Sequence, residues 1–212
     1  MQFQHARGSS PKILPPSFFL QEDVCLVARA LLGKLLQTSF REGTTVGRIV
    51  ETEAYEGVTD MASHAFGGRR TARTDVMFRT GGTAYVYLCY GMHYLTNVVT
   101  HREGVPHAVL LRALEPVAGL EVMRHRSGRL SDRLLCAGPG RLSKAMGIHK
   151  EHTGLRLDTP RFCILEDDYL SEAKVVATPR IGVDYAGAHA LLPYRFIWAG
   201  HPCLSGPRTA HG

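Results

Sequence analysis

Two glutamates lie one residue apart in the segment ETEAY, residues 51–55. Residues 45–55 are rich in β-branched side chains and predict a strand in which Glu51, Glu53 and Tyr55 share one face. Two such carboxylates stand roughly 7 Å apart, a separation at which an acid and a base can flank a glycosidic bond with a water between them. The alternative is a solvated strand edge that merely carries two glutamates.

A long glycine-rich loop, residues 56–82, follows this strand and contains His64, Arg69 and Arg73. Long loops inside compact domains are usually functional. A loop that carries cations and an imidazole beside a strand ending in Glu53 suits the rim of a pocket. A single loop histidine can equally be a structural or a surface residue.

Half of the eight tyrosines of the chain lie within TAYVYLCYGMHYLTN, residues 83–97. Strands over about 83–89 and 93–99 would form a hairpin, and aromatic residues commonly pair across hairpins. Tyr90 differs from the other tyrosines because it stands at the turn beside Gly91, where its ring would project into solvent. Exposed aromatic rings on a basic protein suit base stacking and wedge insertion.

The remaining pattern mixes helices and strands without regular βαβ alternation, which indicates an α+β fold. Polar ends at residues 1–15 and 204–212 are expected to be flexible tails around one domain, residues 16–203. The further predicted elements are helices over residues 22–32, 116–125 and 138–146 and strands over residues 107–114, 180–183 and 195–198.

The composition restricts the class of partner. The chain has 212 residues, a formal charge of +6 and a pI near 9.2, with more arginine than lysine, which favours a polyanion such as nucleic acid. Five cysteines without a CxxC pair argue against a disulfide framework or a zinc ribbon, and the histidines show no ligand spacing, so no metal is expected. The sequence has no apolar run long enough to span a membrane, so the protein is expected to be intracellular and not membrane-bound.

Five motifs in one order carry a family resemblance: ETEAY, SHAFGGRRTART, MFRTGGTAYVYLCYGMHYLTNVV, VLLRALEP and CAGPGRLSKAMGI. Over about residues 17–200 the sequence resembles the alkyladenine (3-methyladenine, methylpurine) DNA glycosylase family. The resemblance implies a monomeric single domain with a curved antiparallel sheet that needs no metal or cofactor. It also implies an enzyme that flips an alkylated or deaminated purine out of double-stranded DNA and hydrolyses its N-glycosidic bond, in a bacterial nucleoid or a nucleus.

The resemblance assigns the chemistry to two residues and the pocket to others. Glu53 matches the general base that deprotonates a water aimed at C1′, and Arg112 matches an arginine that helps hold the water and keeps Glu53 ionised. Tyr55 and Tyr87 match the walls that sandwich the base, for roughly 1–3 kcal/mol of stacking per base. His64 would offer a hydrogen bond to the purine edge.

Further matches concern the duplex and base selection. Tyr90 matches the intercalating tyrosine that fills the gap left by the flipped base, with Met92 beside it. Asn97 matches an asparagine that excludes guanine through its 2-amino group. The expected phosphate contacts are Arg69, Arg73, Arg141 and Lys144.

The same resemblance orders the substrates. Cationic 3-methyladenine and 7-methylguanine leave without an acid, whereas neutral hypoxanthine and ethenoadenine need protonation at N7, for which the sequence offers no evident acid. No lysine matches a Schiff-base position, so strand cleavage is not expected. Histidine at position 93, where the family commonly has an aromatic residue, puts the substrate preference in question.

Two other functions stay open at this stage. A non-catalytic reader of damaged nucleic acid would keep the pocket and the wedge but release no base. A glycosidase that acts on a small glycoside through Glu51 and Glu53 would show no salt-dependent affinity for DNA.

Overall fold

The long strand β2 (Gly43–Tyr55) organises the fold. In the computed structural model, which describes residues 11–128, 130–167 and 174–206, β2 pairs along one edge with β5 (His107–Ala118). Along its other edge it pairs first with β1 (Leu35–Phe40) and then with β9 (Arg195–Trp198). Three register shifts between β2 and β5 bend the strands, as β-bulges do. The bend turns the end of β2 away from β1 and toward β9.

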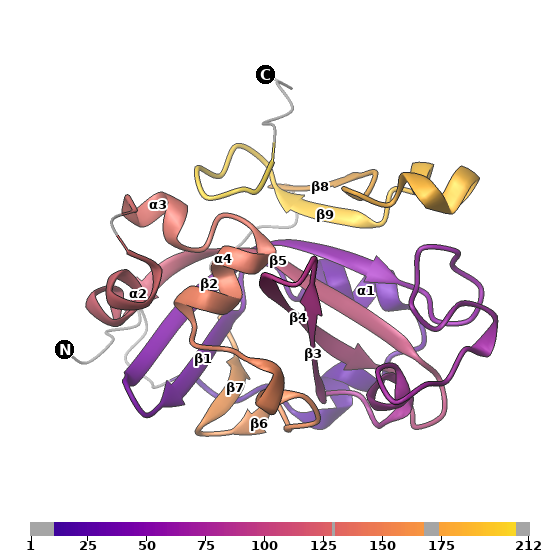
Figure 1. The fold of residues 1–212 in the computed structure, drawn as a ribbon, viewed down its shortest axis with the longest axis horizontal. Helices are drawn as coiled ribbons and strands as arrows, with labels where there is room; N and C mark the ends of the chain where they lie inside the picture. The colour runs from indigo at the N-terminus through magenta and orange to yellow at the C-terminus, as the bar shows by residue number, and fades with distance from the viewer. Residues whose placement is uncertain (1–10, 129, 168–173, 207–212) are drawn as a thin grey trace.

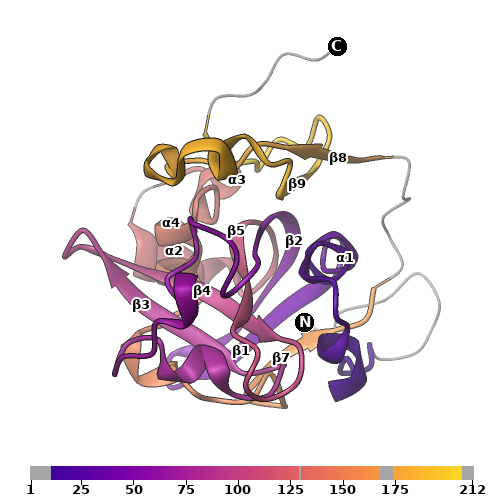
Figure 2. The ribbon, with the colours of Figure 1, turned by 90° about the vertical axis from the view of Figure 1, so that its right-hand side faces the viewer.

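All strand pairs in the described residues are antiparallel, and together they form a nine-stranded sheet in the order β3-β4-β5-β2-β1-β7-β6. β9 joins β2 to β8 off this path. The sheet curls into a half-barrel, and β8 and β9 lie along one side of it (Figures 1 and 2). The other strands are β3 (Ala84–Cys89), β4 (His93–Thr100), β6 (Asp158–Thr159), β7 (Phe162–Leu165) and β8 (Val175–Thr178).

The predicted first helix is present as α1 (Val24–Ala30), somewhat shorter than the expected range 22–32. Asp23 caps it by accepting hydrogen bonds from the amides of Cys25 and Leu26, which would otherwise lack partners. The other helices, α2 (Leu120–Ser127), α3 (Asp132–Leu135) and α4 (Pro139–Ala145), gather at the opposite flank of the sheet (Figure 1). Short 3₁₀ segments are η1 (Pro16–Leu20), η2 (Phe66–Gly68), η3 (Asp75–Phe78), η4 (Lys150–His152) and η6 (Asp184–Leu191).

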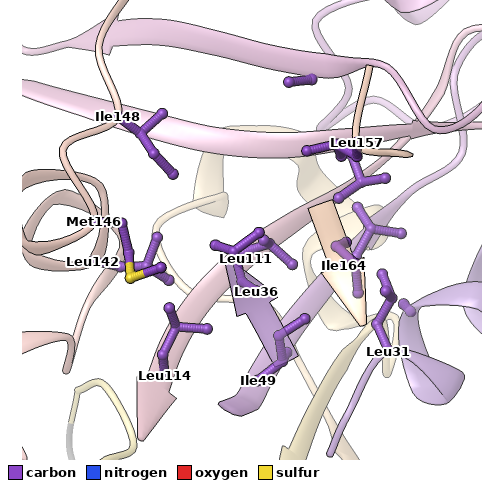
Figure 3. Packing of buried hydrophobic residues seen from close by; sticks show 14 of the residues in the cluster. Leu31, Leu36, Ile49, Leu111, Leu114, Leu142, Met146, Ile148, Leu157 and Ile164 are labelled. Carbon is purple, nitrogen blue, oxygen red and sulfur yellow. The ribbon is translucent and has the colours of Figure 1, made fainter. Parts of the chain in front are cut away.

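The main core lies inside the curl of the sheet. Leucine and isoleucine side chains from β1, β2 and β5 meet residues of α1 and the α4 region there (Figure 3). β2 passes close to β5 at Gly47, where a Cβ atom would stand 2.7 Å from Leu114 Cδ1. The buried residues of this core include Leu31, Leu36, Ile49, Leu111, Leu114, Leu142 and Met146.

The predicted helix over residues 116–125 is present as α2, but its predicted start at Pro116 is wrong. β5 continues through Pro116 to Ala118, and α2 starts only at Leu120. Pro116 pairs opposite Gly47 at a register shift, a place where a strand tolerates a residue without an N–H. Gly119 makes the turn into α2 with φ of 74°, and a Cβ there would stand 2.2 Å from the Thr44 carbonyl oxygen.

The predicted strand over residues 180–183 is also wrong. The strand that pairs with β9 is β8, which ends before Pro179, and residues 180–183 are irregular. The backbone N–H of Ile181 donates to the carboxylate of Glu53 instead of to a neighbouring strand. The predicted strand 195–198 is confirmed as β9.

Some residues of the two predicted tails are packed in the domain. Leu14 is buried and its N–H donates to the Ile164 carbonyl at 2.8 Å. Ser205 is buried as well and donates to Glu51. The rest of the predicted tails, residues 1–10 and 207–212, lies outside the described residues. The predicted fold class, a single α+β domain with a curved antiparallel sheet, is confirmed.

A membrane-spanning helix would need a longer apolar run than any helix in the described part of the chain provides.

Candidate active site

A cavity of about 540 Å³ opens where the β3–β4 hairpin, the 56–82 loop, the start of α4 and residues 181–185 meet. Its size falls within the usual range for a small-ligand site. The residues predicted from sequence converge on it from separate parts of the chain. Those that line it are Tyr55, His64, Arg73, Tyr87, Tyr90, Asn97 and Arg112.

Glu53 lies directly behind the wall of this cavity. Its side chain is fully buried, whereas the sequence predicts a carboxylate that faces the pocket directly. The Tyr55 hydroxyl donates to Oε2 at 2.8 Å, the Ile181 amide donates to Oε1 at 2.8 Å, and Arg112 Nη1 lies 3.2 Å from Oε1. Tyr55, Ile181 and Arg112 all line the cavity, so one layer of atoms separates the carboxylate from it. A carboxylate has about four acceptor positions, and these three donors leave one.

Arg112 connects Glu53 to Glu51. Its Nε donates to Glu51 Oε1 at 2.8 Å, and its Nη2 donates to Ser205 Oγ at 3.1 Å. The two-residue period of a strand puts Glu51 and Glu53 on one side of the sheet, and both lie within reach of the Arg112 guanidinium. Burial by itself lowers the pKa of Arg112, but the carboxylates of Glu53 and Glu51 more than offset this effect. The pKa therefore lies above its usual value and the guanidinium stays charged.

Aromatic rings form the walls of the cavity, and each wall carries an arginine. The His64 and Tyr87 rings meet edge to face with centroids 4.8 Å apart. The guanidinium of Arg73 lies over the Tyr87 ring at 4.6 Å, and that of Arg180 lies over the Tyr55 ring at 4.8 Å. Arg180 is itself held by the buried carboxylate of Asp60.

His64 is neutral at physiological pH. Burial and the nearby charge of Arg73 lower its pKa to about 4. Its Nε2 lies 3.3 Å from Arg73 Nη2 and its Nδ1 lies 2.9 Å from the Tyr85 hydroxyl. Because a guanidinium can only donate, Nε2 is the acceptor and Nδ1 carries the proton. The imidazole therefore presents an acceptor to the cavity.

The hairpin turn projects away from the protein. Tyr90 is 87% exposed and Met92 is 73% exposed. Tyr90 and Gly91 both have positive φ, 49° and 69°, and the Met92 amide donates to the Cys89 carbonyl at 3.1 Å. Positive φ is strained for tyrosine but not for glycine. The backbone thus holds a large ring in solvent at some conformational cost.

Asn97 lies at the cavity floor, where it is buried and donates from Nδ2 to the Tyr85 carbonyl at 3.1 Å. Of the four expected phosphate contacts, only Arg73 lines the main cavity. Arg69 lines an adjoining cavity of about 430 Å³ that shares Arg73 and His64 with the first. Arg141 and Lys144 are exposed on α4, outside both cavities.

Position 93 is part of the cavity wall as well. His93 faces the start of α4, where a Cβ at Gly140 would stand 2.8 Å from the imidazole Cγ. Only glycine at position 140 lets the helix approach the hairpin this closely.

Several cavity residues have no predictive pattern in the sequence. Ile181, Val183 and Tyr185 close one side of the cavity, and the Tyr185 hydroxyl donates to the Ala62 carbonyl at 3.2 Å. Behind the cavity, Arg195 and Ser205 both donate to Glu51 and complete a charge network that also contains Glu53 and Arg112. Among the described residues, no group of three or more His, Cys, Asp or Glu side chains is placed to hold a metal ion.

Comparison with known proteins identifies the family of the chain. The profile of the family described as methylpurine-DNA glycosylase matches residues 18–202. Proteins of Chlamydia pneumoniae and Chlamydia felis are 45% and 43% identical over 191 and 187 residues, which is 87% of this chain and 94% and 95% of theirs. A Bacillus cereus protein is 42% identical over 201 residues, 90% of this chain and 98% of its own. All three bear the name "Putative 3-methyladenine DNA glycosylase". The chain belongs to the methylpurine-DNA glycosylase family, whose members are hydrolases that act on N-glycosyl bonds.

Proposed function

We propose that this glycosylase removes alkylated purines from double-stranded DNA by base flipping, and that Glu53 activates the attacking water. The observation that carries the proposal is the ion pair between Glu53 and Arg112 directly behind a cavity with aromatic walls. A general base that activates a water for attack on a sugar carbon needs a fixed carboxylate at the end of a purine-sized slot.

In this proposal Tyr90 enters the duplex and takes the place of the extruded purine. Extrusion costs a few kcal/mol of stacking and pairing. A side chain that is already exposed loses little by entering the duplex, and its ring stacks on the neighbouring bases.

The purine then occupies the space beside Tyr87 where the Arg73 guanidinium now lies. That guanidinium is a planar cation stacked on an aromatic face, and a protonated or alkylated purine has the same character. This contact supports 3-methyladenine and 7-methylguanine as the better substrates. The acceptor nitrogen of His64, once released from Arg73, suits an exocyclic amino group such as that of adenine.

The reaction requires the Glu53 carboxylate to reach water. Because the carboxylate is fully buried, Ile181, which covers it from the cavity side, has to move as the nucleotide enters, and a water then occupies the remaining acceptor position of the carboxylate. Glu53 takes one proton from this water as the water oxygen bonds to C1′. The electrons of the C1′–N bond pass to the purine, which leaves neutral if it began as a cation.

The test is replacement of Glu53 by Gln, with Glu103→Gln as a control that changes the net charge equally at an exposed position. Single-turnover release of 7-methylguanine from duplex DNA is expected to fall by at least about 10²-fold in the first variant, with DNA affinity within a few-fold of wild type. The control is expected to keep the wild-type rate. Release by Glu53→Gln at the wild-type rate would refute the assignment.

A further inference from the structure

The carboxylate of Glu51 is fully buried, yet it lines neither of the two cavities described above. It accepts four hydrogen bonds: from Arg112 Nε at 2.8 Å, Arg195 Nε at 2.7 Å, the Ser205 amide at 2.7 Å and the Ser205 hydroxyl at 2.8 Å. A buried charge is costly unless it is paired in this way. Such a complete set of partners indicates a fixed anion with a positional role.

The position that Glu51 fixes is that of Arg112. A guanidinium is planar and rigid, so holding two of its nitrogens determines where the third points. Glu51 holds Nε, and the Ser205 hydroxyl accepts from Nη2 at 3.1 Å while donating its own proton to Glu51. The remaining nitrogen, Nη1, then lies 3.2 Å from Glu53 Oε1.

Arg195 balances the charge of this cluster. It is buried, its Nη2 donates to the Ser205 carbonyl at 3.4 Å, and its Nη1 donates to Thr178 Oγ1 at 3.3 Å. Two carboxylates and two guanidiniums thus share one enclosed site. Arg195 holds the backbone of Ser205 where the Ser205 hydroxyl can accept a hydrogen bond from Arg112.

We propose that Glu51, Arg195 and Ser205 are positioning residues that aim Arg112 at Glu53. This inference rests on the proposed function of Glu53. It makes a serine close to the end of the described chain part of the active centre, although Ser205 does not line the cavity.

Ser205→Ala provides the test because it removes only the hydroxyl and keeps the backbone N–H bond to Glu51. Single-turnover release of 7-methylguanine from duplex DNA is expected to slow about 10- to 100-fold, the loss typical of one hydrogen bond to a charged group. DNA affinity should stay within about twofold of wild type. Ser205→Thr, which keeps the hydroxyl, should recover most of the rate. Thr38→Val is the matched control, because Thr38 is a buried hydroxyl with two hydrogen bonds outside the cavity.

A double-mutant cycle with Arg112→Lys separates positioning from a general structural role. Lysine cannot reproduce the fork that Ser205 holds, so adding Ser205→Ala to Arg112→Lys should slow release by less than about twofold. Equal losses in both backgrounds, or a wild-type rate for Ser205→Ala, would overturn the inference while leaving Glu53 as the base. A wild-type protein that binds the duplex but releases no base would overturn the proposed function, and this inference with it.

Discussion

The charge network behind the cavity and the hairpin turn that carries Tyr90 differ in their exposure to solvent and in their hydrogen bonding. Glu51 and Glu53 are fully buried, and each accepts hydrogen bonds from two or more donors. Tyr90 is 87% exposed on a backbone with positive φ. One region is fixed by its partners, and the other is held out in solvent by a strained turn.

The difference matches the two tasks that the proposed function assigns to these regions, which make different demands. Activation of a water needs charges at fixed distances, which only a buried and fully hydrogen-bonded cluster provides. Entry into a duplex needs an exposed aromatic ring that gives up few contacts with its own protein when it inserts. Changes in the network should therefore lower stability and the chemical rate together, whereas loss of the Tyr90 ring should slow the reaction on duplex DNA without a loss of stability.

The largest effect is expected for Arg112→Gln, which leaves Glu51 and Glu53 without their shared cation. Removing one partner of a buried ion pair costs about 3–5 kcal/mol of unfolding free energy. Base release should fall by about 10²-fold or more. Urea unfolding and single-turnover release on the same preparation measure both. Loss of rate with unchanged stability would contradict the description of this network as a buried, mutually dependent cluster.

Tyr90→Ala should come next, with a reduction of about 10- to 100-fold in release from intact duplex, the equivalent of about 1–3 kcal/mol of stacking. The loss should shrink on a substrate whose damaged base is already unpaired. Tyr90→Phe keeps the ring and should keep the rate. In contrast to the network variants, Tyr90→Gly should raise the unfolding free energy by about 1 kcal/mol, because glycine tolerates positive φ. A destabilised Tyr90→Gly would show that the turn is not strained.

A smaller effect is expected for the double variant Arg141→Ala/Lys144→Ala on the exposed face of α4. If both residues contact phosphates, the slope of log affinity against log salt should become shallower by about 2. The base-release rate of the bound complex should be unchanged. Arg161→Ala, a basic residue at the β6–β7 turn, is the control. An unchanged slope in the double variant would remove α4 from the DNA-binding surface.

The smallest effect concerns His64 and pH. Its pKa is about 4 in the folded protein and 6.5 by default in the unfolded chain, so the unfolded state binds the proton first as the pH falls. His64 therefore lowers stability progressively between pH 6.5 and about 4, by on the order of 1 kcal/mol after allowance for its partial exposure. His64→Gln should lose this part of the pH dependence of urea unfolding. An identical dependence in both proteins would contradict the buried, neutral imidazole.

The sequence predicted the local elements better than the connections between them. The periodic spacing of the first helix and the hairpin around Tyr90 depend on neighbouring residues, and both are confirmed in place. Pro116 misled the prediction because proline often opens a helix. Here it occupies a bulge against β2, a strand that is a neighbour in space but distant in the sequence. The irregular course of residues 180–183 likewise depends on bonds to Glu53 and Asp60, which lie more than a hundred residues earlier.

The candidate site shows the same division. The motifs pointed to Tyr55, His64, Tyr87, Asn97 and Arg112, and the structure brings all five to one cavity. Burial of Glu53 could not be predicted, because it results from the return of residue 181 over the end of β2. Arg195 and Ser205 carry no motif, and their part follows from geometry alone.

The bonds to Ser205 also bear on how the protein is made. Glu51 and Ser205 are 154 positions apart, so during translation Glu51 leaves the ribosome long before its final donors are synthesised. A nascent chain must keep this acid hydrated while the rest of the sheet assembles, since enclosing it early would leave an uncompensated charge. Contacts of such long sequence separation form slowly. The hydrogen bonds around Glu51 are therefore completed late, and on the proposed function shortened translation products that stop before position 205 should be inert.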